Sequence, residues 1–401
     1  MLKNFLRCGA ATNHACDNVG RKTVPTLFKQ ILTVALIFFV LTGFAYAEQK
    51  KSVWQPELRV GILIGVAKVN LQVSAPCVLV DPSNNKTLKK LPAGKIFAID
   101  VASMKINAVE IRPEKIPLKD LQSTIDGKKY YGGVRVNKTN NALTVINLAP
   151  LEEYLCGVVC KEMSPSFPIE SLKAQAVAAR SFSMKNRKKH EHEGFDLCAT
   201  THCQMYVGVE NFPSVDEAID STHGEVLTFN DKIAETNFHA DSGGMTENVA
   251  DVWGSGAAAY LVPVKELVQL TAPWTKNFSA KDFSSRFGDG FGDVKSIKLS
   301  ALTIGKSAHD RTSSGRVKSA EIVGTKKTLT ISGVDLRRKF SLPSTLFDMK
   351  LSGGEVIFTG YGSGHGVGMS QKGAKAFAEN GWDYKKILAH YYSGTKLKKL
   401  Y

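Results

Sequence analysis

The chain has 401 residues, of which 43% are hydrophobic, and it carries a formal net charge of +15 at pH 7. This length and apolar content suffice for one large or two ordinary globular domains and argue against a disordered chain. The basic residues are spread along the sequence without zinc-finger spacing, an RNA-binding motif or a basic-region helix, which argues against nucleic acid as the partner.

Residues 1–47 are predicted to be an export signal. Five basic residues precede an apolar run at residues 31–47, which ends in the small-residue pattern Ala45-Tyr46-Ala47. About 17 apolar residues lie near the lower limit for spanning a bilayer, so a cleaved signal peptide and a membrane anchor both remain open. Either outcome predicts an extracytoplasmic protein, and residues 48–56 are predicted to be a short polar tether.

The next part, residues 57–147, is predicted to be a β-rich subdomain. It consists of short β-branched runs separated by Gly, Pro, Asn and Asp turns. It contains no catalytic constellation, and its lysine clusters at residues 86–90 and 128–129 are typical of solvated surface. Helices then follow, so we expect an α+β fold with a helical core centred on two helices and a mixed β C-terminal part.

Residues 151–180 predict these two helices, joined by an elbow that contains Pro165 and Pro168. Glu162 lies at the end of the first helix and prolongs its apolar face. That face follows steps of four, three and four residues: Leu151, Leu155, Val158 and Glu162. Burial would raise the pKa of this carboxyl, so it could hold a proton as a general acid must. Taken alone, an ion pair at the helix end explains Glu162 better.

Five cysteines follow the export signal, and an odd number argues against a framework of disulfides alone. Cys156 and Cys160 are one helical turn apart and are interpreted as packing residues, although one of them could pair with Cys77.

The stretch HEHEGFDLCATTHCQ contains enough sulfur and imidazole groups for a tetrahedral zinc site. The best quartet is His192, Cys198, His202 and Cys203, with His190 as a possible substitute. A disulfide between Cys198 and Cys203 is the alternative in an oxidising compartment.

The C-terminal half is predicted to contain a helix at residues 214–221, a strand at 225–229 and further strands, including one at 296–305. Between them, TNFHADSGGMTENVADVWG places His239, Ser242 and Gly243 where side chains and backbone amides could meet a ligand, although a turn with a satisfied histidine is equally possible. Near the end, GYGSGHGVGMSQKGAKAF sets glycines around His365 before a helix that begins near Met369. This stretch lacks the Gly-Lys-Ser/Thr ending of a phosphate loop.

Three blocks in this order resemble the SpoIID/LytB domain family: residues 151–180, FDLCATTHCQMYVG, and GSGHGVGMSQKGAKAFAENGWDYKKILAHYYSGTKL. The resemblance covers most of residues 56–401. It implies a SpoIID-like catalytic domain at residues 148–401 and a peptidoglycan lytic transglycosylase with Glu162 as the catalytic acid/base. It also implies a substrate groove formed by His239, Ser242, Gly243, His365, Ser370 and Gln371. Residues Ala240 and Asp241 depart from the small hydroxylated residues often seen at these positions.

The resemblance favours zinc over a disulfide at Cys198 and Cys203. Some related proteins carry His and Cys ligands in the loop after the second helix, as this chain does. Four protein ligands would close the coordination sphere, so a structural zinc ion is expected and none is required for chemistry.

The expected reaction follows from the single well-placed carboxylate. Ordinary glycosidases need two carboxylates, whereas a lytic transglycosylase cleaves the MurNAc-GlcNAc bond with one and leaves a 1,6-anhydro-MurNAc end. Peptide-stripped glycan carries a carboxylate on every muramic acid, which a basic protein would attract. The alternative is a non-catalytic wall-binding protein that stimulates an N-acetylmuramoyl-alanine amidase. Spore formation, division and other wall remodelling all remain open.

Overall fold

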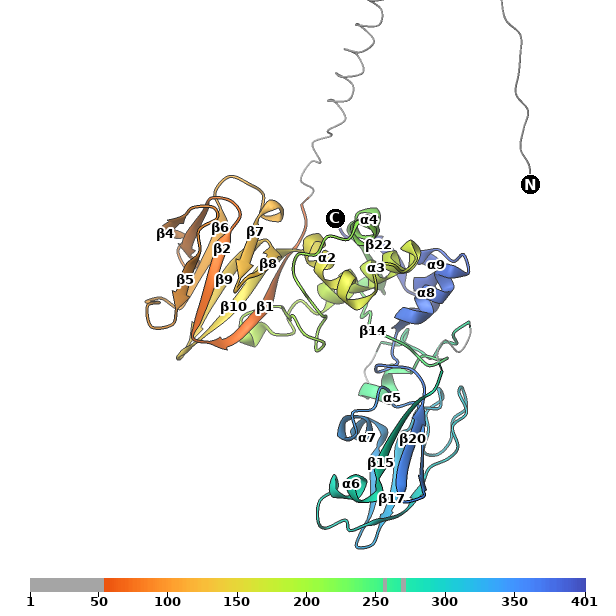
Figure 1. Ribbon diagram of the computed structural model, residues 1–401. Coiled ribbons are helices and arrows are strands. Elements are labelled where there is room, and N and C mark those ends of the chain that lie inside the picture. Colours follow the sequence, from red (N-terminus) through yellow and green to blue (C-terminus); the bar gives the residue numbers. More distant parts are fainter. Residues whose placement is uncertain (1–53, 255–257, 268–271) are drawn as a thin grey trace, which may run out of the picture. The chain divides into compact units, whose positions relative to one another are not determined.

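The computed structural model describes residues 54–254, 258–267 and 272–401, and it confirms an α+β protein (Figure 1). Residues Trp54–Tyr401 form one compact unit. The predicted export signal at 1–47 and the first part of the predicted tether lie outside the described residues. Within the described ranges, no helix combines the length and the apolar character needed to cross a membrane.

Two sheets make up the predicted β-rich part. The strand order is β11-β1-β10-β9-β6-β3-β4 in one sheet and β5-β2-β7-β8 in the other. In β9 (Gly133–Thr139), Val134 and Val136 are buried whereas Arg135 and Asn137 are less so, which is the alternation expected of a strand with one core face. The remaining elements are β1 (Glu57–Val66), β2 (Lys68–Val73), β3 (Cys77–Asp81), β4 (Lys86–Leu91), β5 (Phe97–Asp100), β6 (Ala108–Pro113), β7 (Gln122–Ile125), β8 (Lys128–Tyr131), β10 (Ala142–Pro150), β11 (Leu197–Cys198) and the 3-10 turn η1 (Leu118–Asp120).

Strand β10 leads directly into the helical core. It ends at Pro150, and α2 (Leu151–Glu162) begins at the next residue, so the predicted boundary between residues 147 and 148 falls inside this strand. Pro150 precedes the first helical residue with φ −59°, a backbone angle that suits a helix start. The β-rich part and the helical core are therefore joined without a linker.

Helix α3 (Ile169–Lys185) is the centre of the helical core. Leu172 and Ala176 belong to the hydrophobic core shared with the sheets, whereas Ala174 and Val177 belong to a second core with α8 and α9. Burial on both sides explains why so many small residues occupy this helix, because they permit close packing. The other elements of this part are η2 (Glu191–Glu193), α4 (Pro213–Ser221), β12 (Glu225–Phe229), β13 (Lys232–Ile233), β14 (Phe238–His239), α5 (Val249–Trp253), β21 (Met369–Ser370), α8 (Gln371–Glu379), α9 (Tyr384–Tyr391) and β22 (Lys396–Lys399).

A third core lies within residues 274–358. Its centre is aromatic: the rings of Phe283 and Phe340 stack at 4.8 Å, and Phe358 lies 5.3 Å from Phe340. Two three-stranded sheets, β15-β20-β19 and β16-β17-β18, surround it. The elements are β15 (Trp274–Ser279), α6 (Ala280–Ser285), β16 (Val294–Lys298), β17 (Ser319–Gly324), β18 (Thr328–Ser332), α7 (Gly333–Lys339), β19 (Phe347–Ser352) and β20 (Glu355–Gly360).

The strand predicted at residues 296–305 is wrong beyond Lys298, where β16 ends. The N–H groups of Ser300 and Leu302 donate to the carboxylates of Asp310 and Asp348 at 2.7 and 2.9 Å. Because side chains satisfy these backbone donors, the segment has no need of a partner strand.

Candidate active site and metal site

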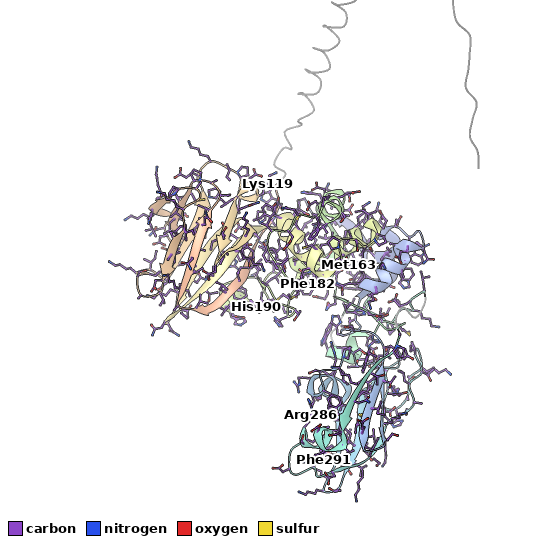
Figure 2. All side chains as sticks on the ribbon, in the orientation of Figure 1. Lys119, Met163, Phe182, His190, Arg286 and Phe291 are labelled. Carbon is purple, nitrogen blue, oxygen red and sulfur yellow. The ribbon has the colours of Figure 1, made fainter. Side chains whose placement is uncertain are left out.

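Helix α2 ends at Glu162 and presents its carboxylate at the edge of the core. Leu151, Leu155 and Val158 are fully buried, and Glu162 is half-buried on the same face. Met163, which is labelled in Figure 2, adopts an extended conformation with φ −128° and ψ 148°. The chain therefore leaves the helix immediately after the carboxylate, and the predicted apolar face is confirmed.

Two donors from distant segments approach the Glu162 carboxylate. The backbone N–H of Met205 donates to Oε1 at 2.8 Å, and Nε2 of Gln371, the first residue of α8, lies 3.5 Å from Oε2. Burial raises the pKa of Glu162, and these two donors offset only part of the increase. The carboxyl can keep its proton at a higher pH than an exposed glutamate, as a general acid requires.

Glu162 lies on the wall of a pocket of about 630 Å³, whose lining also includes His239 and His365. Among the described residues that line this pocket, Glu162 is the only carboxylate. The arrangement therefore offers one carboxylate beside several neutral or cationic groups. The other lining residues are Phe182, Lys189, Thr201, His202, Cys203, Asn237, Phe238, Trp253, Arg337 and Gly364.

The two pocket histidines are neutral at ordinary pH. Burial lowers the pKa of His239 well below its usual value, with a further contribution from His365, and burial together with Arg337 lowers the pKa of His365 to about 4. Nδ1 of His239 donates to the carbonyl of Val367 at 3.1 Å, whereas Nδ1 of His365 accepts from the N–H of Val367 at 3.0 Å. Val367 thus fixes the proton on Nδ1 in His239 and on Nε2 in His365. The centroids of the two rings lie 5.4 Å apart.

The glycine-rich loop brings His365 against His239. Strands β14 and β21 pair in parallel, and Gly364, in the loop that precedes β21, adopts a φ of 107°. A Cβ atom at Gly364 would lie 2.7 Å from Cβ of His239. Only glycine allows this approach, which explains the glycine on the N-terminal side of His365.

Ser242, Gly243 and Ser370 do not line the pocket. The Ser242 hydroxyl donates to Glu266 at 2.7 Å, and the Ser370 hydroxyl accepts a backbone N–H at the start of α8. Both serines are fully buried. Gly243 adopts a φ of 76° in the turn that follows Ser242. The geometry of these three residues supports a role in shaping the loops behind the pocket.

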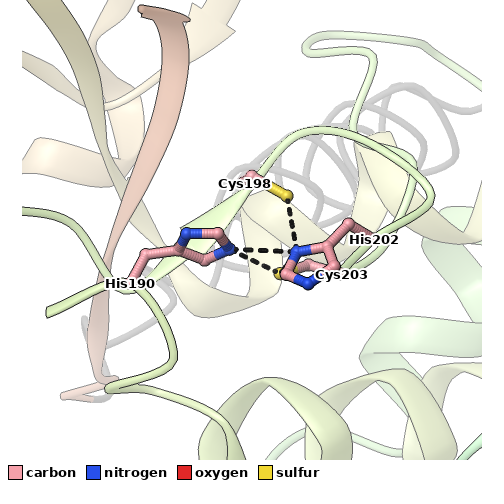
Figure 3. Close-up of side chains that lie close together, drawn as sticks. All are labelled: His190, Cys198, His202 and Cys203. Atoms are coloured by element: carbon pink, nitrogen blue, oxygen red, sulfur yellow. Dashed lines mark hydrogen bonds between the residues drawn. The ribbon is translucent and has the colours of Figure 1, made fainter. Parts of the chain in front are cut away.

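Four cysteine and histidine side chains converge beside the pocket, as Figure 3 shows for His190, Cys198, His202 and Cys203. One donor atom from each lies within 4.8 Å of the others. His190 Nε2 is 3.2 Å from His202 Nδ1 and 3.4 Å from Cys203 Sγ. His202 Nδ1 is 3.7 Å from Cys198 Sγ and 3.8 Å from Cys203 Sγ.

These distances fit a tetrahedral zinc ion. With bonds of about 2.3 Å to sulfur and 2.0–2.1 Å to nitrogen, zinc would hold its donors about 3.3–3.8 Å apart. His190 is also suitably oriented, because its Nδ1 is hydrogen-bonded to Glu193 and its Nε2 faces the cluster. The cluster could therefore hold a metal, and its donor set favours zinc.

His190 takes the position that the predicted quartet gave to His192. His190 immediately precedes the 3-10 turn η2, and His192 is its second residue. Side chains two residues apart in such a turn point in different directions. The His192 side chain is 78% exposed and lies near Glu193, outside the cluster. His190, which the sequence suggested as a substitute for His192, is thus the residue that joins Cys198, His202 and Cys203 in the cluster.

The cysteines of the described residues are all free thiols, so neither predicted disulfide alternative is seen. Burial opposes ionisation of Cys198, but hydrogen bonds from Thr200 and His202 outweigh it and lower its pKa to about 6. A readily ionised thiol suits a metal ligand, because thiolate is the binding form.

Four features around Glu162 escaped the sequence analysis: the Met205 N–H, which contacts its carboxylate, and the pocket residues Lys189, Trp253 and Arg337. Met205 acts through its backbone, which no side-chain pattern reveals. Arg337 belongs to α7, whose core is separate from that of α2. Trp253 is the penultimate residue of the stretch that contains His239, and its large apolar side chain beside a polar motif was the one available signal.

Comparison with known proteins places these features within a family. Residues 139–229, which contain Glu162 and the cysteine–histidine cluster, match the family model described as Stage II sporulation protein, and residues 269–368 match a domain of unknown function (DUF8618). Stage II sporulation protein D of Bacillus amyloliquefaciens is 34% identical over 285 residues, which cover 66% of this chain and 78% of that protein.

Two further relatives agree. Stage II sporulation protein D of Bacillus subtilis (strain 168) is 34% identical over 269 residues, covering 62% of this chain and 75% of that protein. The amidase enhancer of the same organism is 28% identical over 355 residues, covering 77% of this chain and 49% of that protein. The chain therefore belongs to the SpoIID family, as its three sequence blocks predicted.

Proposed function

We propose that the protein is a lytic transglycosylase that cleaves the MurNAc-GlcNAc bond of peptide-stripped peptidoglycan and leaves 1,6-anhydro-MurNAc ends. One observation carries this proposal: Glu162 is the only carboxylate among the described residues of the pocket, and its burial favours the protonated form. Glycosidases that use water need a second carboxylate to activate the water or to act as the nucleophile. Attack by a hydroxyl of the substrate itself removes that need.

Glu162 performs both proton transfers in this mechanism. Its carboxyl group gives a proton to the glycosidic oxygen while the bond between that oxygen and the anomeric carbon breaks. The resulting carboxylate takes the proton of the C6 hydroxyl of the same muramic acid, whose oxygen forms the new bond to the anomeric carbon. The proton returns to Glu162 and no water is consumed, so the enzyme is ready for another cycle.

The surrounding groups support these transfers. The Met205 N–H at 2.8 Å stabilises the carboxylate that exists between the two steps. His239 and His365 are neutral and would exchange hydrogen bonds with sugar hydroxyls. Arg337 lines the same pocket and would attract the lactyl carboxylate of muramic acid.

The cysteine–histidine cluster would have a structural role. His190, Cys198, His202 and Cys203 would hold a zinc ion, which would cross-link the loop and leave no open position for water. Because His202 and Cys203 also line the pocket, holding this loop fixes one of its walls.

We place this activity outside the cytoplasm, because residues 1–47 have the pattern of an export signal, either cleaved or kept as an anchor. The partners are glycan strands and an amidase that removes their peptides beforehand.

The second candidate is a non-catalytic enhancer of such an amidase, which the similarity to a protein named amidase enhancer favours. Incubation of purified protein with peptide-free glycan separates the two. Release of anhydro-muramic ends supports the transglycosylase. If neither anhydro nor reducing ends appear, and if the Glu162→Ala variant stimulates an amidase as well as the parent does, the enhancer is the correct function.

A further inference from the structure

A second, larger pocket of about 1050 Å³ adjoins the pocket of Glu162. The two share part of their walls, because five residues line both: Phe182, Lys189, His202, Asn237 and Trp253. A single small ligand typically fills about 300–1,000 Å³. Together the two pockets therefore offer room for a chain of several sugar units instead of one.

Trp253 lies where the two pockets meet. It is the last residue of α5, its side chain is 53% exposed, and its ring lies 5.1 Å from the ring of His365. An exposed indole supported from one side is a rigid, flat, apolar surface. The C–H face of a pyranose ring matches such a surface in size and polarity.

Lysines surround the larger pocket and give it a positive charge. Lys185, Lys189 and Lys232 line it, and two of them, Lys185 and Lys189, interact electrostatically with Glu235. Glu235 is the only carboxylate among its described lining residues. Asn186 Nδ2 donates to both Glu235 oxygens, at 3.0 and 3.2 Å, and burial raises the pKa of this group. The pocket therefore favours an anionic ligand.

We propose that the larger pocket is a subsite for a second muramic acid of the same glycan strand, with the sugar ring on Trp253 and the lactyl carboxylate facing Lys185 and Lys232. This inference rests on the proposed function, which supplies an anionic amino sugar as substrate. A neutral sugar would gain less from these ammonium groups than an anionic one, because it carries no charge to attract them. Removal of the stem peptide is what frees the lactyl carboxylate, so this subsite would select stripped strands.

Binding is measured in the Glu162→Gln background, which prevents turnover. The ligands are peptide-free MurNAc-GlcNAc oligosaccharides and neutral GlcNAc oligosaccharides of equal length, titrated by calorimetry. Lys185→Ala combined with Lys232→Ala should weaken binding of the anionic ligand about tenfold and leave the neutral ligand unchanged, since each exposed pair contributes modestly. Lys89→Ala combined with Lys90→Ala, which removes the same charge from the exposed strand β4, should leave both ligands unchanged.

Trp253→Ala should lower the affinity for both ligands about fivefold or more. Trp253→Phe should lower it less, because the ring is partly kept. The subsite is wrong if the Lys185→Ala/Lys232→Ala substitutions leave the affinity for the anionic ligand unchanged. It is also wrong if the Lys89→Ala/Lys90→Ala substitutions lower that affinity equally. A separate cleavage assay with the parent protein tests the proposed function. If the protein cleaves glycan but its binding does not depend on the two lysines, the subsite alone is overturned. If binding depends on the lysines but no cleavage occurs, the proposed enzymatic function alone is overturned.

Discussion

The backbone N–H of Met205 donates a hydrogen bond of 2.8 Å to the carboxylate of Glu162. Met205 follows Cys203 of the candidate metal site by two positions, so the end of the cysteine–histidine loop contacts the proposed catalytic group directly. The intervening Gln204 is fixed as well, because its side-chain oxygen accepts from the hydroxyl of Ser183 at 2.9 Å. The loop and the carboxylate therefore form one structural unit.

Removal of the metal should consequently lower the stability of the fold. Cleavage should then fall because the fold is less stable. We expect one zinc ion per chain in protein purified without added metal, and a chelator should lower the melting temperature, because a ligand bound only by the folded state stabilises it. Elemental analysis and thermal melts provide the measurement. His190→Ala should lose the metal, whereas His192→Ala is the matched control and should retain it. Absence of zinc together with an oxidised Cys198–Cys203 pair would overturn this assignment.

The raised pKa of Glu162 predicts a pH dependence of activity and of stability. Cleavage requires the protonated carboxyl, so the rate should fall as pH rises through the folded-state pKa. The folded protein also binds more protons than the unfolded chain between the unfolded and folded pKa values, so this group costs stability as pH rises through that window. Glu162→Gln should thus raise the melting temperature relative to the parent at pH 7 and leave it unchanged at pH 4. A larger gain at pH 4 would contradict the assigned burial.

The ion pair between Arg180 and Glu152 should be a main determinant of stability. Nε and Nη2 of Arg180 donate to the two Glu152 oxygens at 2.9 and 2.6 Å, and the two side chains are 0% and 7% exposed. Glu152→Ala would leave a buried cation unpaired and should cost about 3–5 kcal/mol of unfolding free energy. Denaturant unfolding measures this cost. Lys298→Ala, which breaks the exposed pair with Glu321, should change it by about 0–1 kcal/mol.

Binding to the cell wall should weaken as salt rises, because the net charge of +15 acts largely through exposed side chains. Co-sedimentation with sacculi at two ionic strengths measures this effect. Sacculi stripped of stem peptides should bind better than intact sacculi, because their carboxylates are accessible. Stronger binding to intact wall would show that the peptides, and not the glycan, are recognised.

Side-chain patterns were sufficient to predict the helix pair and its key residue. The spacing of Leu151, Leu155 and Val158 identified the buried face of α2, and Glu162 lies on that face as expected. The helix predicted at 214–221 and the strand predicted at 225–229 are also present, as α4 and β12. Local periodicity determines such elements.

Features that depend on tertiary contacts could not be predicted. The choice of His190 over His192 depends on a 3-10 turn, and the end of β16 at Lys298 depends on two aspartates more than ten positions away. The Met205 donor has no side-chain signature. His239 and His365, both expected in the groove, line one pocket, whereas the burial of Ser242 and Ser370 required the structure.

The most direct test of the central claim is mass spectrometry of peptide-free glycan digested by the parent protein and by Glu162→Gln. The parent should produce 1,6-anhydro-MurNAc ends, and the variant should be folded but slower by about 10²–10⁴-fold, the usual contribution of a general acid/base. Circular dichroism of the variant confirms that folding is intact. Reducing ends from the parent, or anhydro ends at an undiminished rate from the variant, would contradict the assignment of Glu162 as the single acid/base of a lytic transglycosylase.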